Sequence, residues 1–315
     1  MTMQTIWSML ADPNMQWIFI GCTLLGLSSG VIGCFSYLRK QSLMGDTLAH
    51  AALPGICIAF MLTGVKSIGL FLIGAGVAGV VATFGIGYIT RHSKLKQDAA
   101  MGIVLSGFFG LGIVLLTLIQ HGDYGNQSGL DKFLFGQAAS MIASDVITMT
   151  IVCALLITVC TLLFKQFKII SFDPGFARGI GYPVAFLEQL LMLLVVVAVV
   201  AGIQAVGVVL VAALLITPAV SARYWTDRLG LMVVLSGLFG AASGAVGTWI
   251  SASVSNLPTG PVTVLAATLL FGISILFGPQ RGLIAKRLMR QRVKERFIRE
   301  NEPRIHEQVK KEAAL

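Results

Sequence analysis

Long apolar runs separated by short polar stretches dominate the chain from residue 15 to residue 279. A run of about 20 apolar residues is long enough to cross the hydrocarbon core of a membrane as an α-helix. The pattern therefore predicts an all-α, polytopic transmembrane helical bundle. About nine spans are expected, with eight possible because the sixth and seventh runs are short and adjacent: 15–37, 42–63, 67–90, 99–120, 143–164, 185–203, 205–224, 229–252 and 260–279.

Basic residues in the connecting segments predict the orientation of the bundle. They gather in alternate loops, ten against two, and the cytosolic loops of membrane proteins carry the excess of Lys and Arg. The N-terminus is therefore expected outside and the C-terminus in the cytosol. The ten are Arg39, Lys40, Arg91, Lys94, Lys96, Lys165, Lys168, Arg178, Arg223 and Arg228, and the two in the opposite loops are Lys66 and Lys132.

Two loops contain more than a simple connection. In the outer segment 121–140, residues 130–135 predict a short helix at the outer surface. In the inner segment 172–183, Asp173 suits an N-cap and Pro174 the first helical position, which predicts a cytosolic helix of about two turns. Its apolar residues Phe172, Phe176 and Ile180 allow two interpretations: a connector packed under the bundle, or a docking helix for a cytosolic partner.

Composition and charge divide the chain into two parts. Of the 315 residues, 56% are hydrophobic and only 12% are charged, as expected for a membrane protein. Residues 281–315 hold 11 Lys and Arg against 5 Glu, and so contribute +6 of the net charge of +9. We therefore predict a transmembrane domain, 1–280, and a basic charged cytosolic tail, 281–315. Attraction to the anionic lipids of the cytoplasmic leaflet explains the basic tail, so no nucleic-acid partner is needed. The five cysteines lie in apolar stretches and are interpreted as core residues.

Asp46 and His50 are the strongest candidates for chemistry. They lie four residues apart inside an apolar run, which places them on one face of a helix. An ionisable pair within a membrane is costly and indicates a functional site. A carboxylate oxygen and a neutral imidazole nitrogen also form half of a plausible shell for a divalent transition metal. A structural role remains open, with Asp46 capping the helix and His50 bonded to a backbone carbonyl.

No sequence motif supplies a source of energy or a catalytic centre. The chain has no Gly-Lys dipeptide, which excludes a P-loop, and no His-Glu-x-x-His zinc motif. Glu188, Asp98 and Asp145 lie near span edges and are given no role. The chain is therefore interpreted as a transporter and not an enzyme, driven by an ion gradient or by ATP hydrolysed on another chain. Pro218 would interrupt the hydrogen bonding of its helix, and with Thr217 it is a candidate hinge.

Three segments together resemble the manganese/zinc/iron (ABC-3) permeases of bacterial ABC importers. The first is the run from Ser42 through Asp46 and His50 to Gly55, which is most like the manganese permeases. The second is the segment containing Asp173, Ala177 and Gly181, which resembles the coupling helix of that family. The third is a late pattern around Thr217-Pro218 and 253–261. These marks span nearly the whole membrane domain.

The resemblance implies a function and a set of partners. It implies a permease of the bacterial cytoplasmic membrane that carries a divalent metal, manganese first and zinc or iron as alternatives, with no permanently bound cofactor. Asp46 and His50 would line the metal path, and Asp173, Ala177 and Gly181 would contact the ATPase. The implied partners are a cytosolic ATPase dimer, an extracytoplasmic metal-binding lipoprotein and a second permease subunit, the same or a related chain.

Two other functions remain open at this point. A proton-coupled secondary cation transporter would use Asp46 and His50 as a proton relay. An intramembrane hydrolase would use a serine beside glycine, as in residues 26–30 or 241–244, although such serines are usually packing residues. Inverted repeats would favour the secondary transporter, but no second Asp-x-x-x-His occurs later in the chain.

Overall fold

The structure, a computed structural model, describes residues 13–41, 43–64, 68–121, 141, 143–254, 257–287 and 289–291. Within these residues every regular element is a helix, as the apolar pattern predicts. The predicted outer helix at 130–135 and most of the tail lie outside the described residues. The helices are α2 (Pro13–Leu38), α3 (Met44–Thr63), α4 (Ile68–His92), α5 (Gln97–His121), α7 (Ala143–Leu162), α8 (Phe164–Phe172), α9 (Pro174–Gly179), α10 (Val184–Val206), α11 (Val208–Arg223), α12 (Leu229–Ser253) and α13 (Thr259–Phe277).

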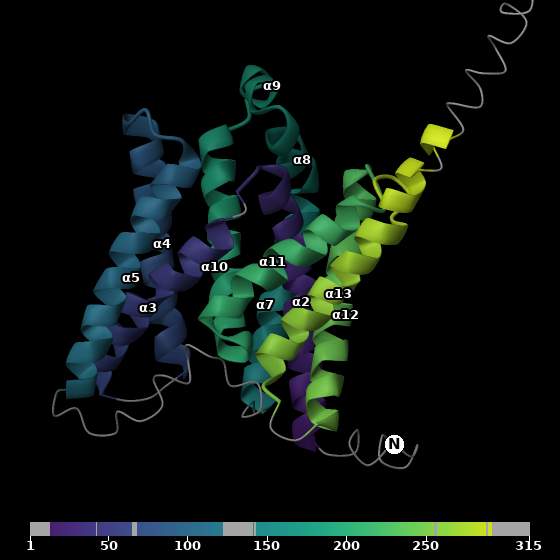
Figure 1. Cartoon of the computed structure of the whole chain (residues 1–315). Coiled ribbons are helices and arrows are strands. Elements are labelled where there is room, and N and C mark those ends of the chain that lie inside the picture. Colours follow the sequence, from purple (N-terminus) through teal and green to yellow (C-terminus); the bar gives the residue numbers. More distant parts are fainter. Residues whose placement is uncertain are drawn as a thin grey trace, which may run out of the picture.

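Eight of the described helices are long and apolar enough to cross a membrane. The helix α11 has 16 residues and is shorter than a usual span. Figure 1 shows α2 beginning at the end of the bundle opposite α9, whereas α13 rises towards the end that carries α9. That arrangement needs an odd number of crossings, with α11 returning the chain between α10 and α12. The nine-span count and the orientation stay predictions.

Two helix boundaries differ from the apolar runs. The fifth span ends at Leu162, and a separate helix, α8, follows from Phe164 to Phe172 with Phe167 and Ile170 buried. The sixth and seventh runs separate at Gly207, whose φ of +87° is a conformation that L-residues rarely adopt. In both places the break depends on the backbone conformation of single residues, which hydropathy alone does not reveal.

Small residues bring α2 and α12 into close contact. A side-chain carbon added to Gly26 would overlap the carbonyl oxygen of Gly240, and one added to Gly240 would overlap the carbonyl oxygen of Gly26. The hydroxyl of Ser236 donates to the carbonyl oxygen of Gly30 at 2.6 Å. Such close approach is how membrane helices associate where hydrocarbon surrounds them. These two helices form the centre of one half of the molecule (Figure 1).

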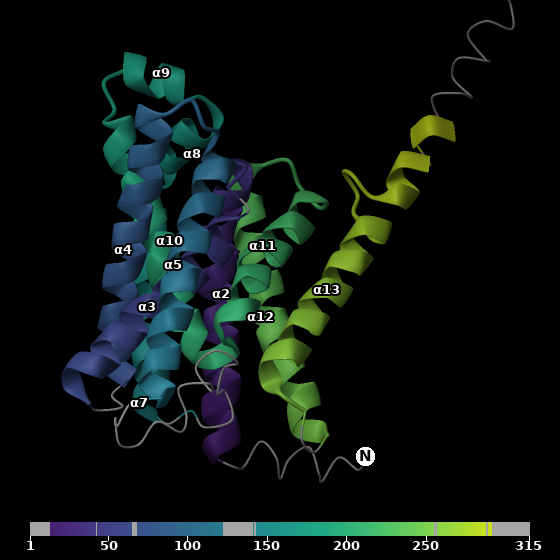
Figure 2. The same ribbon diagram turned by 60° about the vertical axis from the view of Figure 1, so that its left-hand side comes forward.

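The helix α3, which carries Asp46 and His50, packs mainly with α4 and α5 on the other side of the bundle. A carbon added to Gly55 would overlap the carbonyl oxygen of Gly74 on α4, and Gly112 of α5 lies against Leu53. All thirteen residues that α3 buries lie between Met44 and Phe60. Figure 2 shows the same three helices side by side, with α9 beyond the upper end of the bundle.

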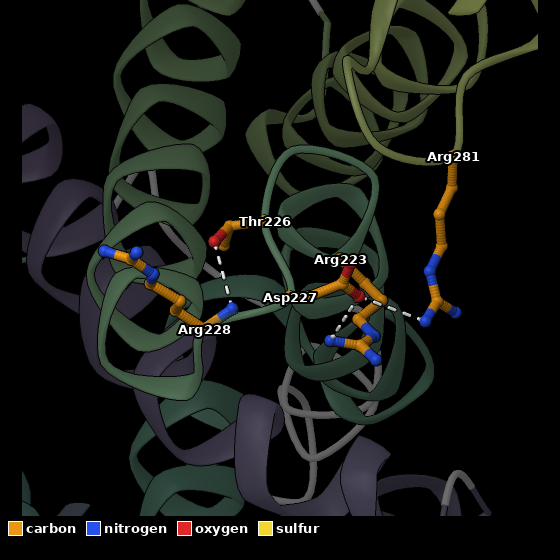
Figure 3. A network of polar contacts seen from close by, with 5 residues as sticks. All are labelled: Arg223, Thr226, Asp227, Arg228 and Arg281. Atoms are coloured by element: carbon orange, nitrogen blue, oxygen red, sulfur yellow. Dashed lines mark hydrogen bonds and ion pairs between the residues drawn. The ribbon is translucent and has the colours of Figure 1, made fainter. Parts of the chain in front are cut away.

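Ion pairs join the α11–α12 loop to the segment after α13 (Figure 3). Asp227 accepts from Arg223 and Arg281, each at 3.1 Å, and Oγ1 of Thr226 accepts from the amide of Arg228 at 3.1 Å. The Asp227 side chain is about half exposed, so these pairs contribute little stability. They nevertheless fix where the tail leaves the bundle. The five cysteines are buried and unpaired, which fits their interpretation as core residues.

Candidate metal path and coupling segment

Asp46 and His50 lie together in the first two turns of α3. Oδ1 of Asp46 is 3.3 Å from Nε2 of His50, as the four-residue spacing predicts. The His50 side chain is 21% exposed and the Asp46 side chain 41%, so both are open at the surface of the single chain. The ring of His50 also meets the ring of Phe109 on α5 edge-on, with centroids 4.8 Å apart. The pair is therefore held on one side and accessible on the other.

The contacts around Asp46 and His50 do not include the two that a structural role would require, a helix cap by Asp46 and a bond from His50 to a backbone carbonyl. The N-cap of α3 is Leu43, with no side-chain cap, and it is Thr47 whose hydroxyl donates to the Leu43 carbonyl oxygen at 2.9 Å. Within the described residues, neither Asp46 nor His50 makes a side-chain hydrogen bond to the backbone. The capping interpretation therefore has no support in these contacts.

A proline four residues after His50 interrupts the backbone hydrogen bonding of α3. Pro54 lies inside α3 and is buried. Because proline has no N–H, the carbonyl of His50 lacks the amide partner that a regular helix would provide. The helix α3 therefore lacks one regular backbone hydrogen bond, one turn after His50.

A single chain supplies an incomplete metal shell. Across the residues that the structure describes, no group of three or more His, Cys, Asp or Glu side chains could hold a metal ion. A tetrahedral or octahedral ion needs four to six donors, and Asp46 and His50 provide two side chains. Metal binding at this pair would need further donors, from a second copy of the site, from water or from backbone oxygens.

The turn before α3 sets the depth of the pair. α2 ends with Lys40 at a φ of +59° and with the amide of Gln41 bonded to the carbonyl of Ser36, the pattern of a Schellman motif. Figure 1 shows α2 ending, and α3 starting, below the upper ends of α4 and α10. The first turn of α3 therefore starts below the ends of the neighbouring helices α4 and α10 (Figure 1).

The predicted coupling segment forms α9, which is shorter than expected. Asp173 is its N-cap, since Oδ1 accepts from the amide of Phe176 at 2.9 Å, and Pro174 is the first helical residue. Both features agree with the sequence prediction. The helix ends at Gly179 after six residues, and Gly181 takes a φ of +89° in the turn that follows. Ala177 is fully buried beneath the helix.

The apolar residues of the coupling segment face outwards. Phe172, Phe176 and Ile180 are all at least half exposed, at the extreme end of the bundle. A connector packed under the bundle would bury these side chains. Their exposure outside the apolar helices favours the docking interpretation.

The candidate hinge lies on a helix that touches the first turn of α3. Pro218 is buried inside α11, one turn beyond Leu215. A side-chain carbon on Gly45 of α3 would come within 3.1 Å of Leu215, so the two helices are in close contact there. Thr217 contributes its carbonyl oxygen to the hydroxyl of Ser221 at 2.7 Å. Thr217 and Pro218 thus lie on the helix that packs against the first turn of α3, whereas Asp173, Ala177 and Gly181 lie apart from it in and beside α9.

One ion pair was not foreseen from the sequence. Nη2 of Arg39, just after α2, donates to Oε1 of Glu188 on α10 at 2.8 Å. The sequence offered only a loop cation and a carboxylate at a span edge, 149 residues apart. No local signal joins two such residues.

Comparison with known proteins agrees with the architecture. The sequence model described as the ABC 3 transport family matches residues 11–278. The manganese transport system membrane protein MntC of Bacillus subtilis (strain 168) is 52% identical over 297 residues, covering 94% of this chain and 68% of that protein. The zinc transport system membrane protein TroC of Treponema pallidum (strain Nichols) is 44% identical over 294 residues, covering 92% and 98%. A solved structure, PsaBC from Streptococcus pneumoniae in complex with Fab, aligns with a TM-score of 0.78 and 36% identity, covering 89% and 98%.

Proposed function

The chain belongs to the ABC 3 transport family, and from this premise we propose that it forms the metal path of an ATP-driven manganese importer. It is a transport subunit and not an enzyme, and a multi-pass protein of the bacterial plasma membrane. The observation that carries the proposal is the Asp46–His50 pair, open at the surface of a membrane helix. The alternative of a proton-coupled secondary transporter is not favoured, because this family serves ABC importers.

In this proposal two permease copies, or this chain and a related one, face each other across the path. Each copy contributes one carboxylate and one imidazole, which together give a four-donor shell that water completes to six. The ion must leave as well as enter, so a shell shared between subunits, which loosens when they move, suits transport better than a closed cage. His50 binds the ion only when its imidazole is unprotonated.

Manganese is the proposed cargo, with zinc and iron as alternatives. The MntC relative is named for manganese and is more similar than TroC, which is named for zinc. Carboxylate, carbonyl and water oxygens suit Mn²⁺, and the pair includes one carboxylate per copy. No metal is treated as a resident cofactor, because the ion is the substrate.

ATP hydrolysis is assigned to separate cytosolic subunits that dock on α9. The exposed Phe172 and Phe176 would enter a cleft of the ATPase, and Asp173 and Gly181 would contact it as the resemblance implies. Ala177, for which the same contact was expected, is buried in the chain and would instead support α9 from beneath. Thr217 and Pro218 would let the two halves of α11 pivot beside the metal pair. A metal-binding lipoprotein would deliver the ion from outside, and the basic tail would lie near anionic lipid.

The cargo is tested by metal accumulation. Cells that express the chain with its ATPase and lipoprotein in metal-limited medium are expected to accumulate manganese, several-fold more than cells without the chain. Total manganese, zinc and iron are measured together by mass spectrometry. A rise in zinc alone would assign the cargo to zinc, and no rise in any metal would contradict the importer.

The docking surface is tested with one charge on α9. Phe176→Asp is expected to weaken binding of the ATPase subunits by roughly tenfold or more, since buried aromatic anchors dominate such interfaces. Co-purification of the ATPase with the permease from membranes measures the effect. Leu95→Asp is the matched control, because Leu95 is also exposed but belongs to the α4–α5 loop. Equal recovery of the ATPase with the Phe176 variant and the wild type would rule out docking through this face.

A further inference from the structure

Arg39 and Glu188 form an ion pair that is mostly withdrawn from solvent. Nη2 of Arg39 lies 2.8 Å from Oε1 of Glu188, and the two side chains are 11% and 28% exposed. The second terminal nitrogen of Arg39, Nη1, is buried and has no hydrogen-bond partner among the described residues. Burial of a charge is costly unless it is paired. The position of Arg39 therefore depends on one carboxylate of α10.

Arg39 belongs to a tight turn that leads directly into the metal-site helix. The amide of Gln41 donates to the carbonyl of Ser36 at 3.0 Å, and the amide of Met44 donates to the carbonyl of Gln41 at 3.2 Å. Gln41 itself is buried. Because these hydrogen bonds tie Gln41 to the end of α2 and to the start of α3, a displacement of Arg39 also moves the first turn of α3, which carries Asp46.

Glu188 follows the coupling segment through a second tight turn. The amide of Tyr182 donates to the carbonyl of Ala177 at 3.0 Å, and the amide of Leu187 donates to the carbonyl of Pro183, also at 3.0 Å. The helices α9 and α10 are thus joined by backbone hydrogen bonds, with Glu188 in the second turn of α10. A movement of α9 is carried to the Glu188 carboxylate.

We propose that the Arg39–Glu188 pair passes the movement of α9 to the Asp46–His50 pair. The inference rests on the proposed function, since it assumes that α9 meets the ATPase and that Asp46 and His50 bind the cargo. Within the described part of the chain, this is the side-chain hydrogen bond that joins the α9–α10 segment to the α2–α3 turn.

An ion pair suits this role better than the apolar contacts around it. Apolar contacts between helices are non-directional and survive sliding. A paired charge in a poorly solvated position has one favourable partner and resists separation. When α9 moves, Arg39 follows Glu188 and tilts the turn before α3. Arg39 and Glu188 are positioning residues, because they act on the metal through Asp46 and His50.

The test distinguishes a role of the Arg39–Glu188 pair in passing on movement from a role in stabilising the fold. Arg39→Met with Glu188→Met removes the link and leaves no unpaired buried charge, which single substitutions would do. Arg39→Glu with Glu188→Arg restores a pair in the opposite sense. Each variant is reconstituted in liposomes with the ATPase subunits and manganese-loaded lipoprotein. The readout is manganese transported per ATP hydrolysed, beside the apparent Tm and the recovery of the assembled complex.

We expect the double Met variant to assemble and melt like the wild type but to lose roughly tenfold in manganese moved per ATP, a usual size for coupling between sites. The exchanged pair should recover about half of the wild-type ratio or more, because the charges interact again. A double Met variant with the wild-type ratio overturns the link. A fall in manganese moved per ATP that comes with a lower Tm or poor assembly also overturns it. The same holds if the exchanged pair recovers none of the wild-type ratio.

The control is another ion pair of the same chain. Arg281→Met removes the contact between the α11–α12 loop and the segment after α13 (Figure 3), leaves Asp227 paired with Arg223, and should leave the ratio unchanged. Wild-type liposomes that move no manganese, or that move it equally well with Asp46→Asn, would contradict the proposed function itself. Transport that needs Asp46 but is indifferent to the double Met change overturns the link alone.

Discussion

Asp46→Asn and His50→Gln are each expected to lower manganese uptake by roughly 100-fold. Substitution of residues that merely support a metal ligand lowers affinity or activity by about 10- to 100-fold, and loss of a ligand itself should reach the upper end of that range. Both changes keep the size of the side chain, but the first removes the negative charge and the second the imidazole nitrogen. Each occurs twice if two copies line the path, so one substitution removes two donors. Uptake of radioactive manganese into cells, at matched membrane levels of the permease, measures the loss.

The matched control for Asp46→Asn is Asp98→Asn. Asp98 also lies in the first turn of its helix, α5, but its side chain is exposed and was given no role. It should transport like the wild type. If the Asp46 and His50 variants also take up manganese normally, the pair is structural and the metal path lies elsewhere. If Asp98→Asn fails with them, a general effect of charge at helix starts explains the result.

The fold could be predicted from the sequence wherever one property of a local segment decides the structure. An apolar run of sufficient length must form a helix in a membrane, because no water is there to satisfy the backbone. The helix α12 (Leu229–Ser253) accordingly matches the predicted span 229–252 within one residue. The Asp46–His50 contact was predictable for the same reason, since residues four apart share a helix face.

Features that depend on contacts between residues far apart in the sequence, or on the backbone conformation of one residue, could not be predicted. Nothing near Arg39 in the sequence identifies Glu188, and their pairing depends on how α2 and α10 pack. The separation of α7 from α8 depends on Leu163, whose backbone leaves the helical conformation at a φ of −97° and a ψ of +15°. Leucine is a good helix former, so its identity gives no indication of a break.

The close contact of α2 with α12 is an intermediate case. Many glycines predict close packing somewhere in a membrane bundle, but not which helices approach. The structure supplies the pairing: Gly26 lies against Gly240, and Gly30 lies against Ser236. In each case a backbone atom occupies the space that a side chain would need. A backbone cannot move aside as the end of a flexible side chain can, so these glycines tolerate no substitution without a shift of the helix.

Gly240→Ala is therefore expected to destabilise the permease by about 3 kcal/mol, the upper end for overpacking in a close-packed interior. One methyl group would have to displace the Gly26 carbonyl and, with it, the whole contact between α2 and α12. The apparent Tm in detergent should fall by about 5 °C or more. Gly272→Ala on α13 is the matched control, since a carbon added there meets nothing within 4 Å, and its Tm should stay within about 1 °C of the wild type. Equal melting of both variants would show that α2 and α12 do not approach at these glycines.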